Sequence, residues 1–572
     1  MTDATQADSD VIAVQAYHER TKHRLTGYAA GPDTLDWDAQ PDPFRRYAGA
    51  PLTPLPLTAD KVTTPWADLF EPGRVAPHPM NRAAIGLLFE LSFALSAWKQ
   101  YGPDRWAMRI NPSSGNLHPT EAWLLCQGVA NIDEGVHHYA PREHALEQRA
   151  SFAPQPDVAT ARAFVALTSI QWRETWKYGE RAFRYCQLDV GHAIGALRYA
   201  AAVLGWRLQS VACSTAQLAA LLGLDRDADF CTAEREEPDT LFELRPGNTA
   251  AENDSPFDWP VPSQWQGTPN QLDRQPMYRW PVVDAVAVAT RVHAVRPEVP
   301  GSLGGRAFCA GQGGARAAGG GHGAERTAAQ TPPDLSRSTQ PAATLIRQRR
   351  SAQHFDARAR MPVAQLWLLL RALHPARLPF DAWPAEPRVH VLLFAHRVDG
   401  LAPGAYLLPR SVAGSDLLRR SVPAELNLSP VSDAPADAPL LLLGENPALA
   451  GTLRTLNCHQ ALGSDAILGF ALLAEFNPLP SAAAYRQRFQ EAGLIGQVLY
   501  LEAEALGLRG TGIGCFFDDA LHQLIGLPQS ATSAPLQSVY HFTVGAPLLD
   551  ARIATEPPYA HLLSGREGIT HG

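Results

Sequence analysis

One loop of the sequence concentrates hydrogen-bonding side chains between two prolines. Residues 111–121 read Asn-Pro-Ser-Ser-Gly-Asn-Leu-His-Pro-Thr-Glu and stand directly before an apolar segment. A glycine lets the backbone approach a ligand closely, and each proline limits the conformations of the loop. Because Ser, Asn and Gly are also common turn residues, the residue types leave a binding loop and an ordinary turn as equal alternatives. The candidate ligand contacts are Pro112, Ser113, Ser114 and Asn116.

A second cluster combines guanidinium groups with a hydroxyl. Arg349, Arg350 and Ser351 follow one another in the sequence, with Arg347 nearby. Arginine can bind a phosphate dianion in bidentate fashion. A solvated basic patch is the commoner outcome for such a run, and it stands as the alternative.

A third candidate is the glycine-rich string Gly-Thr-Gly-Ile-Gly-Cys at residues 510–515. Backbone N–H groups at Gly512, Gly514 and Cys515 can lie close to a planar ligand, because glycine adds no side chain. No Gly-Lys-Ser/Thr follows, so the string is not a Walker phosphate loop.

The chain also repeats itself over a long distance. Gly191 to Gly205 matches Gly493 to Gly507, with glycine and leucine at corresponding positions, and Cys213 and Cys515 follow at the same offset. A Leu-Leu/Ile-Gly-Leu helix end closes each copy, with a slip of one residue. A unit of this length indicates duplicated domains rather than a short-period solenoid. Small-molecule sites often lie where two domains meet, and one chain can fuse the two subunits of an isologous dimer.

The pattern of elements predicts an α+β fold, because strands and helices mix without regular alternation. Apolar periodicity predicts helices over 81–99, 191–204, 363–373 and 493–506, and apolar runs predict strands over 121–126, 389–394 and 439–443. The predicted domains are an N-terminal arm (1–80), a first domain (81–250), a connector that wraps back (251–300), a flexible Gly/Pro-rich linker (301–341) and a second domain (342–572).

Composition narrows the class of protein. The 572 residues exceed the ~100–200 residues of a typical domain, and the net charge of -8 argues against nucleic-acid binding. No apolar run has the roughly 18–20 residues that cross a bilayer, and residues 1–10 do not resemble a signal peptide. The seven scattered cysteines include no C-x-x-C pair, which argues against structural disulfides and a zinc ribbon. A cytoplasmic protein is predicted.

Taken in order, these motifs resemble the nitroreductase superfamily of FMN enzymes, and within it the SagB-type branch that includes the azoline dehydrogenases. The resemblance implies two tandem nitroreductase-like domains that form an intramolecular pseudo-dimer. Arg349 and Ser351 match the Arg-x-Ser motif that helps bind the FMN phosphate. Gln353 stands where a basic residue often assists, and Arg552 is the candidate for the basic residue after the last strand.

The resemblance also gives roles to the other two motifs. Pro112, Ser113, Ser114 and Asn116 match a Pro-Ser-Ser-x-Asn loop that reaches into the partner subunit's flavin site, and residues 512–515 match the segment that faces the flavin N5 edge. The first domain has the serine loop without an Arg-x-Ser, whereas the second has the Arg-x-Ser but only Pro-Phe-Asp-Ala-Trp-Pro at 379–384. We therefore predict one composite site and one FMN per chain.

The same branch carries a Lys-Tyr pair near the flavin, which Lys177 and Tyr178 match. A tyrosine beside a lysine ammonium is more easily deprotonated, so Tyr178 is expected to take the proton that substrate oxidation releases. The alternative is that Glu180, Arg181 and Arg184 form a solvated helix face while the tyrosines pack. Asp189 and His192 lie one helical turn apart, too few ligands for a metal; no metal is predicted, and His192 is expected in the core.

Three functions follow from the resemblance. The first is oxidation of a small-molecule or modified-peptide substrate, with peptide-modifying enzymes as partners. The second is an NAD(P)H-dependent nitro- or quinone-reductase, and the third is a non-catalytic binding module with the same fold. No nucleic-acid or membrane partner is expected, and the fused pseudo-dimer can associate further into a homo-oligomer.

Overall fold

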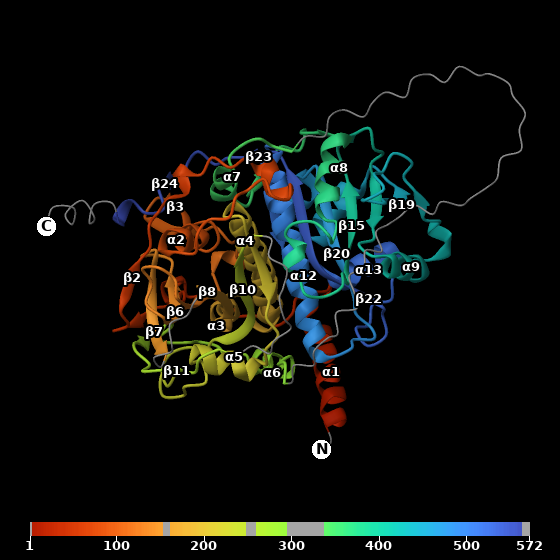
Figure 1. Ribbon diagram of the computed structural model, residues 1–572. Helices are drawn as coiled ribbons and strands as arrows, with labels where there is room; N and C mark the ends of the chain where they lie inside the picture. Colours follow the sequence, from red (N-terminus) through yellow and green to blue (C-terminus); the bar gives the residue numbers. More distant parts are fainter. Residues whose placement is uncertain (1–2, 153–160, 248–258, 294–336, 563–572) are drawn as a thin grey trace, which may run out of the picture.

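Two antiparallel sheets flank a central pair of long helices in the computed structural model (Figure 1). The structure describes residues 3–152, 161–247, 259–293 and 337–562. The first sheet has the strand order β11-β7-β6-β5-β8-β10-β9, with β2 paired to β7, and the second has β18-β19-β17-β15-β20-β22-β21. Both sheets lie against the helices α4 (Ala182–Val203) and α12 (Ala482–Ala505).

The strands of the two sheets have the following bounds. The first sheet contains β2 (Leu52–Pro54), β5 (Thr120–Gln127), β6 (Gly135–Ala140), β7 (Ala145–Phe152), β8 (Arg162–Ser169), β9 (Trp206–Ser210), β10 (Glu237–Pro246) and β11 (Pro262–Ser263). The second contains β15 (Val389–Ala395), β17 (Gly404–Leu408), β18 (Ser429–Pro430), β19 (Leu441–Glu445), β20 (Leu468–Glu475), β21 (Arg509–Ile513) and β22 (Leu536–Gly545).

The two halves connect their strands in the same way. Helices α2 (Arg82–Glu90) and α8 (Val363–Ala372) precede the central strands β5 and β15. The long helices α4 and α12 then lead into the edge strands β9 and β21, and α5 (Thr215–Leu222) and α13 (Asp518–Ile525) follow these strands. The repeat seen in the sequence thus corresponds to one supersecondary pattern used twice.

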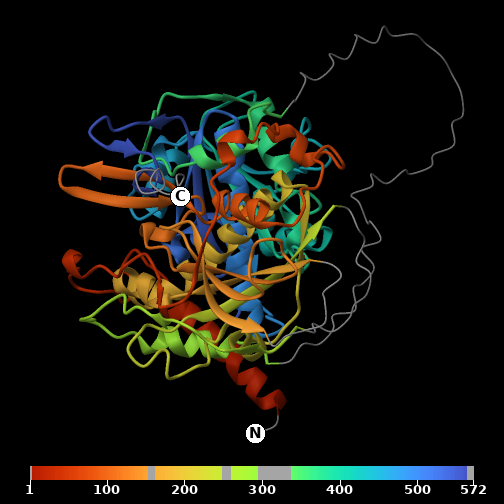
Figure 2. The same cartoon turned by 60° about the vertical axis from the view of Figure 1, so that its left-hand side comes forward.

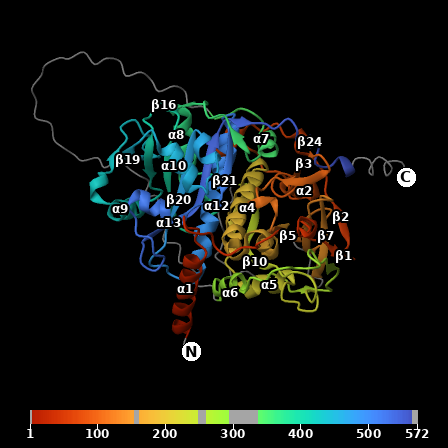
Figure 3. The same cartoon turned by 180° about the vertical axis from the view of Figure 1, so that it is seen from behind.

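The two long helices lie side by side and approach closely at glycine (Figures 1 and 3). A Cβ atom placed on Gly191 would lie 2.0 Å from the carbonyl oxygen of Gln490, and one on Gly493 would lie 2.0 Å from that of Leu188. The spacing that relates Gly191 to Gly493 also relates Leu188 to Gln490. The contact is therefore reciprocal, as in the isologous interface of a two-fold dimer.

The helix pair is the centre of the core. α4 is buried along its whole length, and its polar side chains have partners there, such as Ser114 for Asp189 and Tyr540 for His192. Leu197 and Leu499 on the two helices belong to one hydrophobic cluster with Val165 of the first sheet and Leu472 of the second. The two halves thus share their largest core, so they are held together as one packed unit.

One predicted helix is shorter than expected. The helix predicted over 81–99 ends at Glu90, and strand β3 (Leu95–Tyr101) begins four residues beyond Leu91. β3 pairs with β4 (Asp104–Arg109) across a turn in which Gly102 has φ +57°. The apolar residues near Leu95 face the core from a strand, and a short apolar run does not distinguish the two elements by periodicity.

Each end of the chain packs on the opposite half. Helix α1 (Asp3–Arg20) brings His18 to Tyr485 and Gln537 of the second half, at 3.3 and 3.2 Å. Strand β24 (Ala554–Glu556) returns to pair with β3 beside the projecting β3–β4 hairpin (Figure 2). The predicted linker lies mostly outside the described residues. Among the described helices, none combines the length and hydropathy that a membrane crossing requires.

Candidate functional site

The structure brings the arginine cluster against the serine loop. Arg349 caps the end of α7 (Ala342–Gln348) and is buried. Its Nη2 donates to the carbonyl oxygens of Arg109, at 3.3 Å, and Ile110, at 3.2 Å. Ile110 stands two residues before Pro112, which is itself buried at the start of the loop. Motifs from the two halves of the sequence therefore meet in one place.

The basic side chains around Arg349 lack a matching number of acids. Burial, and then the charges of Arg349 and Arg509, lower the pKa of Arg350 to about 9. Burial also lowers the pKa of Lys99, with Arg350 and Arg509 adding to the shift. The Nε of Arg349 is buried and has no hydrogen-bond partner among the described residues. A phosphate dianion fits this cluster, because it would supply both the missing charge and the missing acceptor.

Tyr500 of α12 connects this cluster to the glycine-rich string. Its hydroxyl lies 2.8 Å from Ser351 Oγ and accepts the N–H of Gly512 at 3.0 Å. A Cβ on Gly512 would lie 1.8 Å from the hydroxyl of Tyr540, so only glycine fits there. The glycine-rich string begins within strand β21 and continues to Cys515. The N–H of Ala352 donates to the carbonyl oxygen of Gly510 in this strand.

The serine loop is fixed to the central helix by a carboxylate. The N–H of Ser114 donates to both oxygens of Asp189 at 3.1 Å, and its Oγ donates to Oδ1 at 2.9 Å. Burial raises the pKa of Asp189 to about 7, although the bonds from Ser114 oppose the shift. Ser113 Oγ accepts the N–H of His118 at 2.7 Å, and Asn116 Nδ2 donates to a β4 carbonyl at 2.9 Å. The loop is therefore rigid, with part of its surface exposed.

Lys177 and Tyr178 lie at the tip of this loop, at the end of α3 (Gln171–Tyr178). A Cβ on Gly115, which has φ +59°, would lie 2.5 Å from Tyr178 Oη and 3.2 Å from Lys177 Nζ. The Tyr178 ring contacts Tyr185 with centroids 4.4 Å apart, and a Cβ on Gly514 would lie 1.9 Å from the Tyr185 ring. The predicted catalytic pair thus lies between the serine loop and the glycine-rich string.

The electrostatics of this pair differ from the sequence expectation. Burial, followed by the negative charge of the nearby Glu174, raises the pKa of Tyr178 well above its usual value. Burial lowers the pKa of Lys177. The tyrosine is therefore harder to deprotonate, and the lysine is the group that loses its proton more readily.

Two buried carboxyl groups near this pair, those of Glu174 and Asp189, were not predicted as site residues. Glu174 is fully buried, and neither carboxyl oxygen has a hydrogen-bond partner among the described residues. Burial, and then Asp189, raise its pKa well above the usual value. Helical spacing in the sequence gives no signal for such a residue, because a lone glutamate is typical of a solvated face.

The alternative of a solvated helix face is wrong. Arg181 and Arg184 are buried, and their Nη1 atoms donate to the carboxylate of Asp518 in the second half, at 3.0 and 2.9 Å. Glu180 is also buried and pairs with Arg20 of α1. The two pairs with Asp518 cross between the halves, and together with the Arg20 pair they hold the segment next to Lys177. His192 is in the core as expected, 3.0 Å from Tyr540.

Arg552 lies apart from the arginine cluster. It is exposed and pairs with Asp550 two residues earlier, at 2.7 Å. Arg509, which the sequence analysis did not single out, is instead close enough to Arg349 and Arg350 to affect their pKa. Its position at the start of β21, directly before the glycine-rich string, was the available signal.

The corresponding place in the other half has different chemistry. The segment 379–384 precedes β15 as the serine loop precedes β5, and its Asp381 pairs with Arg198 of α4 at 2.7 Å. Arg198 occupies the α4 position that corresponds to Tyr500 of α12. An ion pair of Arg198 therefore stands at the position that the Tyr500 hydroxyl occupies in the candidate site.

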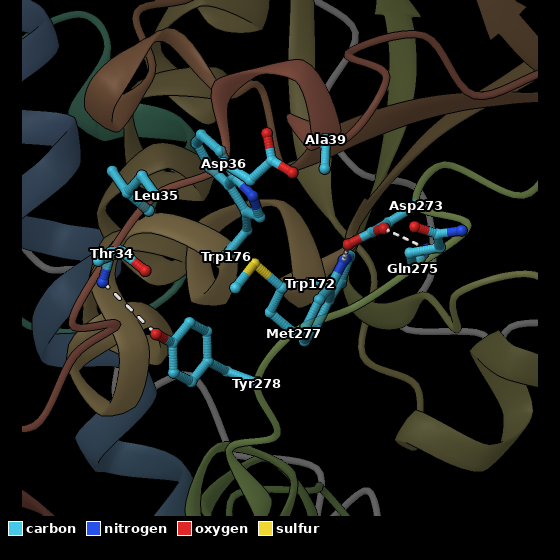
Figure 4. Close-up of a pocket in the computed structure, with 10 residues that line it drawn as sticks. All are labelled: Thr34, Leu35, Asp36, Ala39, Trp172, Trp176, Asp273, Gln275, Met277 and Tyr278. Carbon is cyan, nitrogen blue, oxygen red and sulfur yellow. Dashed lines mark hydrogen bonds between the residues drawn. The ribbon is translucent and has the colours of Figure 1, made fainter.

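A small pocket opens beside α3 (Figure 4). Its wall includes Trp172, Trp176 and Met277, and Trp172 Nε1 donates to Asp273 at 2.9 Å. The Trp176 ring contacts Trp37, whose ring centroid lies 5.5 Å from Lys177 Nζ. The pocket thus adjoins the candidate catalytic pair with an aromatic surface.

Known proteins with a similar sequence or fold indicate the family of the chain. The nitroreductase family model matches residues 346–546. A protein of Methanocaldococcus jannaschii assigned as a nitroreductase is 30% identical over 135 residues, which are 22% of this chain and 67% of that protein. A solved structure from Anabaena variabilis, also assigned as a nitroreductase, has a TM-score of 0.61 at 20% identity and covers 94% of this chain and 99% of its own. That structure is similar in fold. The chain belongs to the nitroreductase family and is an oxidoreductase of that family.

Proposed function

We propose that this protein is an FMN-dependent dehydrogenase of the SagB type, with one flavin bound between two nitroreductase-like domains in a single chain. The reciprocal crossing at Gly191 and Gly493 and the repeated strand order support the pseudo-dimer. The observation that carries the function is the contact of Lys177 and Tyr178 with Gly115 of the serine loop.

The residues present fit the cofactor. Arg349, Arg350 and Ser351, with Arg509 nearby, would hold the phosphate, and the segment from Gly512 would face the ring system. FMN, when bound, supplies the acceptor for a hydride from substrate carbon. Gly512 and Gly514 let the chain pass close to Tyr540 and Tyr185, because a side chain at either position would clash with the tyrosine.

The chain's own residues would manage the proton that substrate oxidation releases. The opposite pKa shifts of the pair favour Lys177 Nζ as the acceptor, because a lysine with a lowered pKa is a better base near neutral pH. Tyr178, whose pKa is raised, would stay protonated and orient the substrate through its hydroxyl. This reverses the roles expected from the sequence, where Tyr178 takes the proton.

The substrate we propose is a partly reduced five-membered heterocycle in a modified peptide. Its oxidation removes a hydride from one carbon and a proton from a neighbouring atom. The hydride would pass to bound FMN, and Lys177 would accept the proton.

The test separates cofactor binding from chemistry. Lys177→Ala should lower turnover about 10²–10⁴-fold, the usual contribution of a general base, and keep the yellow colour. Lys177→Arg should be as slow, because arginine keeps the charge but does not release its proton. Arg349→Ala should weaken flavin retention. Turnover that survives in both Lys177 variants would contradict the assignment, and two tightly bound FMN per chain would contradict the single composite site.

A second candidate is an NAD(P)H-dependent nitro- or quinone-reductase. The observation in its favour is that the relatives described above are assigned as nitroreductases. Anaerobic addition of NADPH distinguishes the two, because rapid bleaching of the flavin favours the reductase, and bleaching by a heterocyclised peptide alone favours the dehydrogenase. A protein that stays colourless after addition of FMN would favour a non-catalytic module.

A further inference from the structure

Two cysteine thiols meet at the end of the glycine-rich string. Cys515 Sγ and Cys458 Sγ lie 2.6 Å apart, and both residues are partly exposed. Cys515 directly follows Gly514, and Cys458 lies in the loop after α10 (Leu449–Leu456). Cys458 and His459 both have positive φ, +51° and +62°, which turns this loop back toward Cys515. A movement of about half an ångström would bring the sulfur atoms to the ~2.05 Å of a disulfide bond.

The surroundings of Cys515 favour its thiolate. The hydrogen bond from Cys458, followed by one from His23, holds the pKa of Cys515 below its usual range, and the charge of Arg181 adds to the effect. The Nδ1 of His23 accepts the N–H of Ala29 at 2.9 Å. The proton of a neutral His23 is therefore on Nε2, the nitrogen left to donate to the sulfur.

Cys458 is the protonated member of the pair. The thiolate of Cys515 raises the pKa of Cys458, so the pair holds one proton between two sulfur atoms. A low-pKa thiolate with a protonated neighbour within bonding distance is the arrangement of an attacking and a resolving cysteine. Cys213, at the corresponding repeat position, has no such neighbour among the described cysteines, and burial raises its pKa to about 11.

We propose that Cys458 and Cys515 form a redox-active dithiol that a low-molecular-weight disulfide oxidises reversibly. The Cys515 thiolate attacks one sulfur of the disulfide, which forms a mixed disulfide and releases the first thiolate. Cys458 then loses its proton and attacks Cys515 Sγ, which releases the second thiolate. The products are one intramolecular disulfide and two small thiols, of which one takes the proton of Cys458 and the other takes a proton from solvent.

Cys515 ends the segment that would face the flavin, so the dithiol adjoins the proposed cofactor site. Cys515 is among the groups whose negative charge raises the pKa of Tyr178, and Tyr185 lies between them against Gly514. Oxidation of the pair removes that charge. The oxidation state of the dithiol would therefore alter the electrostatics of Tyr178 without any change in the cofactor.

The experiment uses the full-length protein, reduced and then equilibrated with mixtures of reduced and oxidised glutathione before alkylation. The expected result is a loss of two hydrogens in mass and a cross-linked peptide that contains Cys458 and Cys515. The Cys458→Ser variant should carry one glutathione on Cys515 and form no intramolecular disulfide. The Cys515→Ser variant should form neither the mixed disulfide nor the intramolecular one. The matched control Cys213→Ser should behave like the wild type.

A second measurement identifies the attacking thiol. At pH 7 the alkylation of Cys515 should be on the order of tenfold faster than that of Cys213, because a larger thiolate fraction outweighs the lower nucleophilicity of a low-pKa thiol. The proposal is overturned if both cysteines remain alkylatable at every glutathione ratio, or if glutathione attaches to Cys458 in preference to Cys515.

Discussion

Substitution of Gly191 by alanine tests the helix crossing on which the composite site depends. The new Cβ would lie 2.0 Å from the carbonyl oxygen of Gln490, whereas real Cβ contacts are essentially never below 3.0 Å. The helices must separate by about an ångström, and overpacking of this kind costs about 1–3 kcal/mol. The intrinsic gain of alanine over glycine in a helix, roughly 0.5–1 kcal/mol, offsets part of that cost.

The expected loss for Gly191→Ala is about 1–2 kcal/mol in the free energy of unfolding, measured by urea titration with tryptophan fluorescence. Gly493→Ala should cost a similar amount, because the crossing is reciprocal. The double variant should lose less than the sum of the two, since one separation of the helices relieves both contacts. It should also bind FMN more weakly, because the same separation moves the two walls of the site apart.

The matched control is Gly451→Ala in α10, where an added Cβ meets nothing within 4 Å. It should raise the free energy of unfolding by about 0.5–1 kcal/mol. If Gly191→Ala and Gly493→Ala also stabilise the protein, the close crossing does not exist in solution, and the composite site loses its structural basis.

Three smaller changes test the site itself. Burial raises the pKa of Asp189 from 3.8 to about 7, so its contribution to stability is full below the unfolded pKa and is lost as pH rises through 7. Asp189→Asn should therefore stabilise by about 3 kcal/mol more at pH 8 than at pH 5, at about 1.36 kcal/mol per pKa unit; equal urea midpoint shifts at both values would contradict this. Gly512→Ala should reduce flavin content, and Tyr540→Phe should restore only part of it, because the added Cβ would still lie 2.7 Å from the Cζ atom of the ring. Glu174→Gln should leave the free energy of unfolding nearly unchanged, since burial raises the pKa of Glu174 and favours the neutral form that glutamine resembles; a gain of about 2 kcal/mol or more would instead indicate that the wild type buries an unpaired charge.

Local patterns in the sequence were sufficient to predict the repeated elements and to locate the motifs. The glycine and leucine spacing of 191–204 and 493–506 lies within the long helices α4 and α12, because a buried helix leaves a periodic record along the chain. The predicted strand at 121–126 is likewise part of β5. Periodicity failed at 91–99, where an apolar run turned from helix into strand.

Only the tertiary structure decided how the motifs combine and what their charges are. Arg349 meets the carbonyls before Pro112 because two helices cross at glycine, and no spacing along the chain records a contact between residues so far apart. The roles that we propose for Lys177 and Tyr178 differ from the sequence expectation for the same reason. Burial and the neighbouring Glu174 act through space, and the pKa of a side chain depends on what surrounds it rather than on what precedes it in the sequence.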